Sequence, residues 1–185
     1  HIDFLLLKLC LKLKNDTNLN NLELDGIAKI VNGEIKDFGS FQLVEKINES
    51  SIIDRDLVRW KNYAYENGNF LKTPGTYATS VIRDCYFGKC TFCRYNGPDL
   101  TFSAMDIMKS VNEYEDLVLN HGVKEIFDDS GVWYRGKEAK LFAKEIIKRG
   151  LHKKGCYFGI NTRFEYLDED TIKWLAKANF RFILI

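Results

Sequence analysis

The sequence is short of several features that would point to other classes of protein. It has two prolines and three histidines among 185 residues, and its 27 basic residues nearly balance 26 acidic ones, leaving a net charge of +1. A charge so close to zero provides no electrostatic attraction for nucleic acid or for an anionic membrane. We therefore expect neither of them among the partners of this chain.

Long apolar runs and targeting signals are missing as well. Lys8 and Lys12 interrupt the leucine-rich stretch near the start too soon for a membrane span. No basic flank followed by a small-residue cleavage pattern marks a secretory signal. Five cysteines without such a signal are typical of a reducing compartment, so we expect a cytoplasmic protein whose thiols are free to bind metal.

Three of the five cysteines lie within nine residues, in the segment Cys-Tyr-Phe-Gly-Lys-Cys-Thr-Phe-Cys. Four residues separate Cys85 from Cys90, and two separate Cys90 from Cys93. Three thiolates on one short loop can converge on a single metal centre. Cysteine thiolates are the ligands of iron–sulfur clusters. The pattern predicts a 4Fe–4S cluster with one iron left open for a substrate or cofactor.

Other interpretations of the cysteines stay open at this point. Cys90-x-x-Cys93 could supply half of a zinc site, although no second Cys-x-x-Cys occurs and the histidines are isolated. A thioredoxin-like redox pair would leave Cys85 without a role. A fourth cysteine ligand would favour an electron-transfer module. However, Cys156 begins a predicted strand and Cys10 lies among leucines, so we expect both in the core.

The first 40 residues contain one clear local signal. The leucines of residues 1–14 are spaced for either a helix or a strand, and periodicity does not decide between them. Residues 26–30 are typical of a strand, Asn32-Gly33 of a tight turn, and Ile35 begins a return strand. This pattern predicts a β-hairpin.

Residues 37–75 lack a clear periodicity and are expected to connect two parts of the chain through short helical turns. Trp60, Tyr63 and Tyr65 form an aromatic cluster in this region. We expect these rings to pack on the following domain rather than to bind a ligand.

From Thr76 onward, strands and helices alternate through short loops. Strands are predicted at residues 77–82, 123–127, 156–160 and 180–185, and helices from Ser103 (as N-cap) to about 121, at 137–149 and at 168–178. This alternation predicts a parallel sheet with right-handed crossovers. The sheet could be open and doubly wound, or it could be part of a barrel.

Both architectures place chemistry at the carboxyl ends of the strands. The cysteine loop follows the first predicted strand, Asp128 and Asp129 end the second, and Asn161 and Arg163 follow the third. These polar residues could instead be a helix cap, a turn and a surface ion pair. Their common position at one edge nevertheless favours a site there.

With this cysteine loop and these strand ends, the sequence resembles a known family, the radical S-adenosylmethionine (SAM) enzymes, and more narrowly their cobalamin-binding branch. The segments that carry the resemblance are Ala78–Cys85, Gly88–Cys93, Gly122–Gly131, Asn161–Arg163 and Phe180–Ile185, with a weaker match at Asp25–Ile35 and Asp54–Asp56. The commonest motif of the family has three residues between the first two cysteines. This chain has four, as in a longer form found in the branch.

The resemblance implies an α/β fold in three parts: a C-terminal remnant of a cobalamin-binding-like domain with its hairpin (1–40), a linker (41–75), and the first four strands of a partial (β/α) barrel (76–185). The sequence starts at His1 and ends at Ile185 inside an apolar run. We therefore expect an internal fragment of a longer protein that is inactive alone, because further SAM-binding and cobalamin-binding segments lie outside it.

The resemblance also implies a mechanism. Cys85, Cys90 and Cys93 would hold three irons, and the fourth would chelate SAM. An electron from an external flavodoxin- or ferredoxin-type donor would split SAM into methionine and a 5′-deoxyadenosyl radical, which abstracts hydrogen from a small-molecule or peptide substrate. In the full-length protein, cobalamin would be a further cofactor for methyl transfer or rearrangement.

The contacts to SAM that the resemblance implies come from the cysteine loop and the strand ends: Phe92 at the adenine, Asp128, Asp129 and Ser130 at the methionine end, and Asn161 and Arg163 at the carboxylate or ribose.

Overall fold

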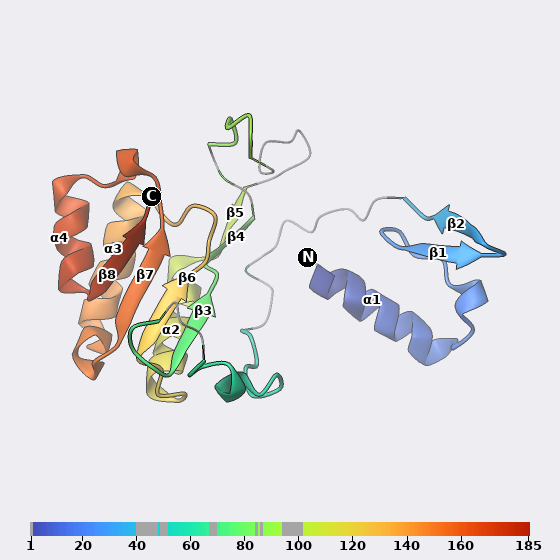
Figure 1. Ribbon diagram of the computed structural model, residues 1–185, viewed down its shortest axis with the longest axis horizontal. Helices are drawn as coiled ribbons and strands as arrows, with labels where there is room; N and C mark the ends of the chain where they lie inside the picture. The colour runs from blue at the N-terminus through green and yellow to red at the C-terminus, as the bar shows by residue number, and fades with distance from the viewer. Residues whose placement is uncertain are drawn as a thin grey trace. The chain divides into compact units, whose positions relative to one another are not determined.

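A computed structural model describes residues 2–39, 48, 52–66, 70–83, 85, 87–93 and 102–185 (Figure 1). The chain divides into two compact units, His1–Lys46 and Ile47–Ile185. Within the described ranges, no helix combines the length and the apolar character needed to cross a membrane.

The first unit begins with helix α1 (Ile2–Asn15), followed by a short 3₁₀ turn, η1 (Leu19–Asn21). The spacing of the leucines left helix and strand open, and the structure has a helix. Leucine and lysine are both good helix formers, which favours this outcome. Cys10 is exposed on α1, so the expectation that it lies in a core is wrong.

The predicted hairpin is confirmed. Strands β1 (Ala28–Val31) and β2 (Glu34–Asp37) pair in antiparallel register. The two loop residues, Asn32 and Gly33, both have positive φ angles, 52° and 84°. Two such residues make the turn whose twist matches that of paired strands, and Asn-Gly is the pair that adopts it most readily.

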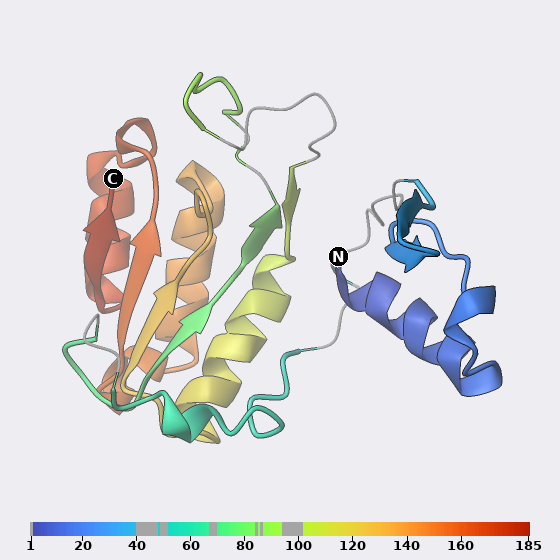
Figure 2. The same ribbon diagram turned by 45° about the vertical axis from the view of Figure 1, so that its right-hand side comes forward.

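The second unit is built on a four-stranded parallel sheet in the order β3-β6-β7-β8. Its strands are β3 (Gly75–Ala78), β6 (Glu125–Asp128), β7 (Tyr157–Asn161) and β8 (Phe180–Leu184). The helices that connect them cover one face of the sheet (Figure 2): α2 (Ile107–Leu119), α3 (Gly136–Lys148) and α4 (Glu169–Lys177). The predicted α/β class and parallel sheet are confirmed, while the barrel and the cobalamin-binding-like domain stay predictions.

The two faces of this sheet differ. Ile126, Phe158 and Ile160 are fully buried in the core beneath the helices. On the other face, Phe127 and Phe182 lie 5.7 Å apart between ring centroids. They meet over Gly159, where an added Cβ would come within 2.6 Å of Phe127 Cδ2. A glycine at this position therefore leaves room for an aromatic layer on the open face.

The first predicted strand, 77–82, is in fact two strands. The parallel strand β3 ends at Ala78, and β4 (Val81–Arg83) pairs antiparallel with β5 (Ser103–Ala104) outside the main sheet. Because Ser103 belongs to β5, it is not the N-cap of α2. Asp106 caps this helix instead, and its carboxylate accepts a hydrogen bond of 2.8 Å from the Met108 N–H.

The aromatic cluster predicted in the connecting region is divided between the core and the surface. Trp60, in the short turn η3 (Trp60–Asn62), is 5% exposed and packs edge-on against the ring of His121, with 5.6 Å between centroids. Tyr63 and Tyr65 are 69% and 61% exposed. The prediction that these aromatics pack on the following domain is thus correct for Trp60 and wrong for the two tyrosines.

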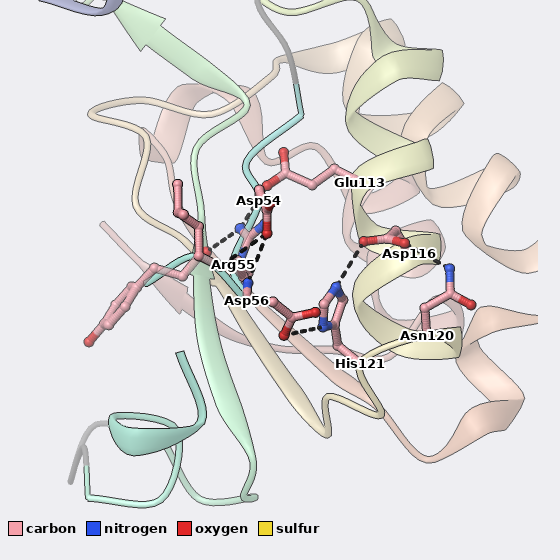
Figure 3. Close-up of polar contacts among 9 residues, drawn as sticks. Asp54, Arg55, Asp56, Glu113, Asp116, Asn120 and His121 are labelled. Atoms are coloured by element: carbon pink, nitrogen blue, oxygen red, sulfur yellow. Dashed lines mark hydrogen bonds and ion pairs between the residues drawn. The ribbon is translucent and has the colours of Figure 1, made fainter. Parts of the chain in front are cut away.

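A buried ion pair attaches the same region to the sheet and to α2 (Figure 3). Arg55 is 5% exposed; its guanidinium donates to Glu113 Oε1 at 2.7 Å and to the Tyr77 carbonyl at 2.9 Å. Burial raises the pKa of Glu113, although the Arg55 charge opposes this shift. Nearby, His121 lies 3.3 Å from Asp116 and 3.9 Å from Asp56.

We expect Glu113→Leu to lower the free energy of unfolding by about 3–5 kcal/mol, because it leaves the buried Arg55 guanidinium without a negatively charged partner. The double variant Arg55→Met/Glu113→Leu is expected to recover most of this loss, since no buried charge remains unpaired. Urea unfolding of the three chains measures both effects. A single variant as stable as the parent chain would contradict the assignment of a buried pair.

Candidate functional site

The cysteine segment leaves the sheet at the carboxyl end of β3 and returns to it beside the same strand. β4 leads into the segment and β5 follows it, and the Met105 N–H donates to the Ser80 carbonyl at 2.8 Å, which closes the base of the excursion. Figures 1 and 2 both show the described part of the segment beyond the edge at which the parallel strands end. This is the edge at which the sequence predicted a site.

The three cysteines are free thiols and each is partly buried. The Cys93 N–H donates to the Cys90 carbonyl at 3.0 Å, so the Cys-x-x-Cys part forms a tight turn. Within the described ranges, no three histidine, cysteine or acidic side chains are gathered closely enough to hold a metal ion. The donor set, three accessible sulfurs on one short loop, fits an iron–sulfur cluster, and cluster assembly would have to draw them together.

Asp128, one of the predicted SAM contacts, is fully buried at the end of β6. Among the described contacts, all the hydrogen-bond donors to its carboxylate are neutral. They are the backbone N–H and hydroxyl of Ser80, the backbone N–H and hydroxyl of Ser130, the Tyr114 hydroxyl and the Trp133 indole N–H. A buried carboxylate is tolerated when hydrogen bonds replace its water. Asp128 is therefore placed to organise the loops.

The Asp128 network fixes the start of the cysteine excursion. Ser80 donates two hydrogen bonds to Asp128 and directly precedes β4. Burial, together with the charge of Asp128, raises the pKa of Tyr114 well above its ordinary value, so Tyr114 remains a hydrogen-bond donor. The pKa of Tyr134 is raised as well, chiefly by burial, and its hydroxyl donates to the Met105 carbonyl at 2.6 Å.

Sequence reasoning missed Ser80, Tyr114 and Trp133. One signal could have indicated the first of them. Ser80 and Ser130 each stand two residues beyond Ala78 and Asp128, which face each other across β3 and β6. Serines at matching positions after adjacent parallel strands can both reach the last side chain of either strand. Tyr114 and Trp133 carry no comparable mark, because their contact with Asp128 depends on how α2 and the loop after β6 pack.

Asp129 and Asn161, both predicted SAM contacts, lie together on the open face. Asn161 Nδ2 donates to the Ser130 carbonyl at 3.1 Å and lies 3.5 Å from Asp129 Oδ1. Asn161 Oδ1 has no hydrogen-bond partner among the described residues. Asp129 is exposed and lines a hollow of about 440 Å³ whose other walls are apolar: Tyr77, Phe127, Phe182 and Leu184.

Arg163 and Phe92, the remaining predicted contacts, are both associated with the cysteine loop. Arg163 follows β7, and its guanidinium carbon lies 3.7 Å from the ring centroid of Phe87, on the cysteine loop. The Arg163 side chain is also ion-paired with Glu165, and both Glu165 and, to a smaller extent, Cys90 raise the pKa of its guanidinium. Phe92 is 91% exposed. The structure thus brings Arg163 to the cysteines and leaves the Phe92 ring in solvent.

Comparison with known proteins supports the fold. No protein-family model matches the sequence, and a comparison with curated proteins finds no match. Among solved structures, the chain is similar to the apo, selenomethionine-labelled cobalamin-dependent S-adenosylmethionine radical enzyme OxsB, with 19% sequence identity and a TM-score of 0.58. The match covers 94% of this chain and 24% of that one, so the chain spans about a quarter of its length. The mixed α/β fold of this chain is thus similar to that of about a quarter of the OxsB chain.

We expect Asp128→Ala to lower the free energy of unfolding by at least about 3 kcal/mol, because each buried donor left without a partner costs roughly 1–3 kcal/mol. Asp129→Ala is the matched control: its side chain is exposed, so its effect is expected to stay within about 0.5 kcal/mol. Equilibrium unfolding in urea measures both. Equal losses in the two variants would rule out the network described for Asp128.

Alkylation of the metal-free chain is expected to separate Cys156 from the other cysteines. Burial raises the pKa of the Cys156 thiol to about 12, so the reactive thiolate is scarce near pH 8. Cys10 is exposed, and Cys85, Cys90 and Cys93 are partly exposed. Timed iodoacetamide labelling with peptide mass mapping is expected to modify Cys156 last. Labelling of Cys156 at the rate of Cys10 in the folded chain would contradict its burial.

Proposed function

We propose that this chain is part of a radical SAM enzyme in which Cys85, Cys90 and Cys93 hold a 4Fe–4S cluster. One observation carries the proposal: the three-cysteine segment lies beyond the carboxyl end of the first strand of a parallel sheet, in a fold shared with part of a radical SAM enzyme. The proposal includes the three parts expected from the sequence: a remnant of a cobalamin-binding-like domain (1–40), a linker (41–75) and the first four strands of a partial (β/α) barrel (76–185).

When bound, such a cluster supplies the electron that splits SAM and so yields a 5′-deoxyadenosyl radical for C–H abstraction. The chain itself contributes in two ways: it positions the cysteine loop, and it excludes water from the site. Asp128 holds the base of the cysteine loop through Ser80. The aromatic walls of the open-face hollow, including Tyr77 and Phe127, provide an apolar surface that binds water only weakly.

Asp129 and Asn161 are the best placed of the predicted SAM contacts. The Asp129 carboxylate lines the hollow and suits a cationic amino group or a ribose hydroxyl. Asn161 Oδ1 is an acceptor without a partner among the described residues. Asp128 and Ser130 act through the loop that they hold, and the exposed ring of Phe92 is available to stack on adenine.

For the whole protein, we propose a small-molecule or peptide substrate, an external electron donor of the flavodoxin or ferredoxin type, and cobalamin as a further cofactor. OxsB is a cobalamin-dependent enzyme, and this chain resembles 24% of the OxsB chain in fold. The hollow on the aromatic open face of the described sheet supports a binding site for a small molecule.

Anaerobic reconstitution with iron and sulfide, followed by electron paramagnetic resonance (EPR) of the reduced chain, tests the proposal. We expect a reduced 4Fe–4S signal that changes when SAM is added. A cluster signal indifferent to SAM in both this chain and a longer one would favour an electron-transfer module. Zinc without iron or sulfide would favour a zinc-binding module.

Alanine variants identify the ligands. Cys85→Ala, Cys90→Ala and Cys93→Ala are each expected to abolish cluster assembly, since each removes one of three thiolates. Cys10→Ala and Cys156→Ala are expected to retain full iron and sulfide content, because one thiol is on α1 and the other is in the core. Full cluster content in any of the first three variants would remove that cysteine from the ligand set.

A further inference from the structure

Arg163 is held firmly at the carboxyl end of β7. The preceding residue, Thr162, is buried and donates its N–H to the Leu184 carbonyl of β8 at 2.9 Å. The turn η5 (Phe164–Tyr166) starts directly after Arg163, and the Tyr166 N–H donates to the Arg163 carbonyl at 3.0 Å. The backbone of Arg163 is therefore fixed to the sheet, and its side chain starts from a rigid position.

The side chain of Arg163 connects this rigid edge to the cysteine loop at two points. Its guanidinium carbon lies 3.7 Å from the centroid of the Phe87 ring, a close cation–π contact. Cys90, three residues further along the loop, is also close enough to this side chain to help raise the pKa of the guanidinium. An ion pair between Arg163 Nε and Glu165 orients the guanidinium plane.

We propose that Arg163 is a positioning residue for the cysteine loop, which it clamps to the end of β7 through Phe87 while it places its guanidinium charge beside Cys90. This inference rests on the proposed cluster, of which Cys90 would be a ligand. It assigns Arg163 to the cluster rather than to SAM. Arginine suits both contacts because its planar guanidinium stacks on a ring and donates from several N–H groups at once.

A positive charge beside a cluster sulfur stabilises the reduced state, which carries one more negative charge. Loss of Arg163 is therefore expected to move the reduction potential to more negative values. Lysine would keep the charge but not the stacking plane, so Arg163→Lys is expected to restore only part of the potential and little of the clamp.

The test is a redox titration of the reconstituted chain without SAM, followed by EPR, for the parent, Arg163→Gln, Arg163→Lys and Lys89→Gln. Lys89→Gln is the matched control, because it removes one positive charge from an exposed residue next to Cys90. We expect the most negative potential in Arg163→Gln and a clearly smaller shift in Lys89→Gln. An unchanged potential in Arg163→Gln, or equal shifts in the two variants, would overturn the proposal.

A second titration with SAM separates the proposed role from a direct contact. If Arg163→Gln keeps the parental potential but loses the spectral change caused by SAM, Arg163 contacts SAM and the inference is wrong. Circular dichroism of each variant checks that the fold is intact, which is expected because the Arg163 side chain is partly exposed.

Limited proteolysis of the metal-free chain tests the contact between Arg163 and the cysteine loop independently of the cluster. Chymotrypsin is expected to cut after the exposed Phe92 faster in Arg163→Gln than in the parent or in Lys89→Gln. Equal rates in all three chains would overturn the clamp. Failure of the parent chain to assemble any cluster would instead overturn the proposed function and the redox role, and the cleavage rates would then decide the clamp alone.

Discussion

The burial of a carboxylate without a cationic partner among its described contacts is the constraint on which the candidate site depends. An ionised group in the interior is stable only where hydrogen bonds replace the water that it has lost. Asp128 obtains its donors from three places: the residues after β3, the loop after β6 with Ser130 and Trp133, and helix α2. These parts have to be in place together, so the network joins the base of the cysteine loop to the core.

Helix α2 connects this network to a second buried charge. Glu113 and Tyr114 are consecutive residues, and the first binds Arg55 while the second binds Asp128. One helical turn therefore holds both the connecting region that precedes the sheet and the loop that carries the cysteines. Arg55 also donates to the Tyr77 carbonyl of β3, the strand that leads to Ser80. The strand that leads to the cysteine loop is thus held at Tyr77 by Arg55 and just beyond its end, at Ser80, by Asp128.

Much of the second unit could be predicted because its signals are local. Each parallel strand is a short apolar run, and each helix is amphipathic, so their order is visible in the sequence. The errors occur where distant residues meet. The strand expected over 77–82 divides because β4 pairs with β5, some twenty residues away, and this pairing moves the helix cap from Ser103 to Asp106.

The sequence by itself determined the spacing of Cys85, Cys90 and Cys93, the Asn32-Gly33 turn and the alternation of strands with helices, because each depends on neighbours in the chain. Only the tertiary structure decided that Asp128 is buried while Asp129 is exposed. Successive strand residues point to opposite faces, and the packing of α2 decides which face is covered. The contact of Arg163 with Cys90 likewise depends on parallel strands ending at one edge, which brings together loops far apart in the chain.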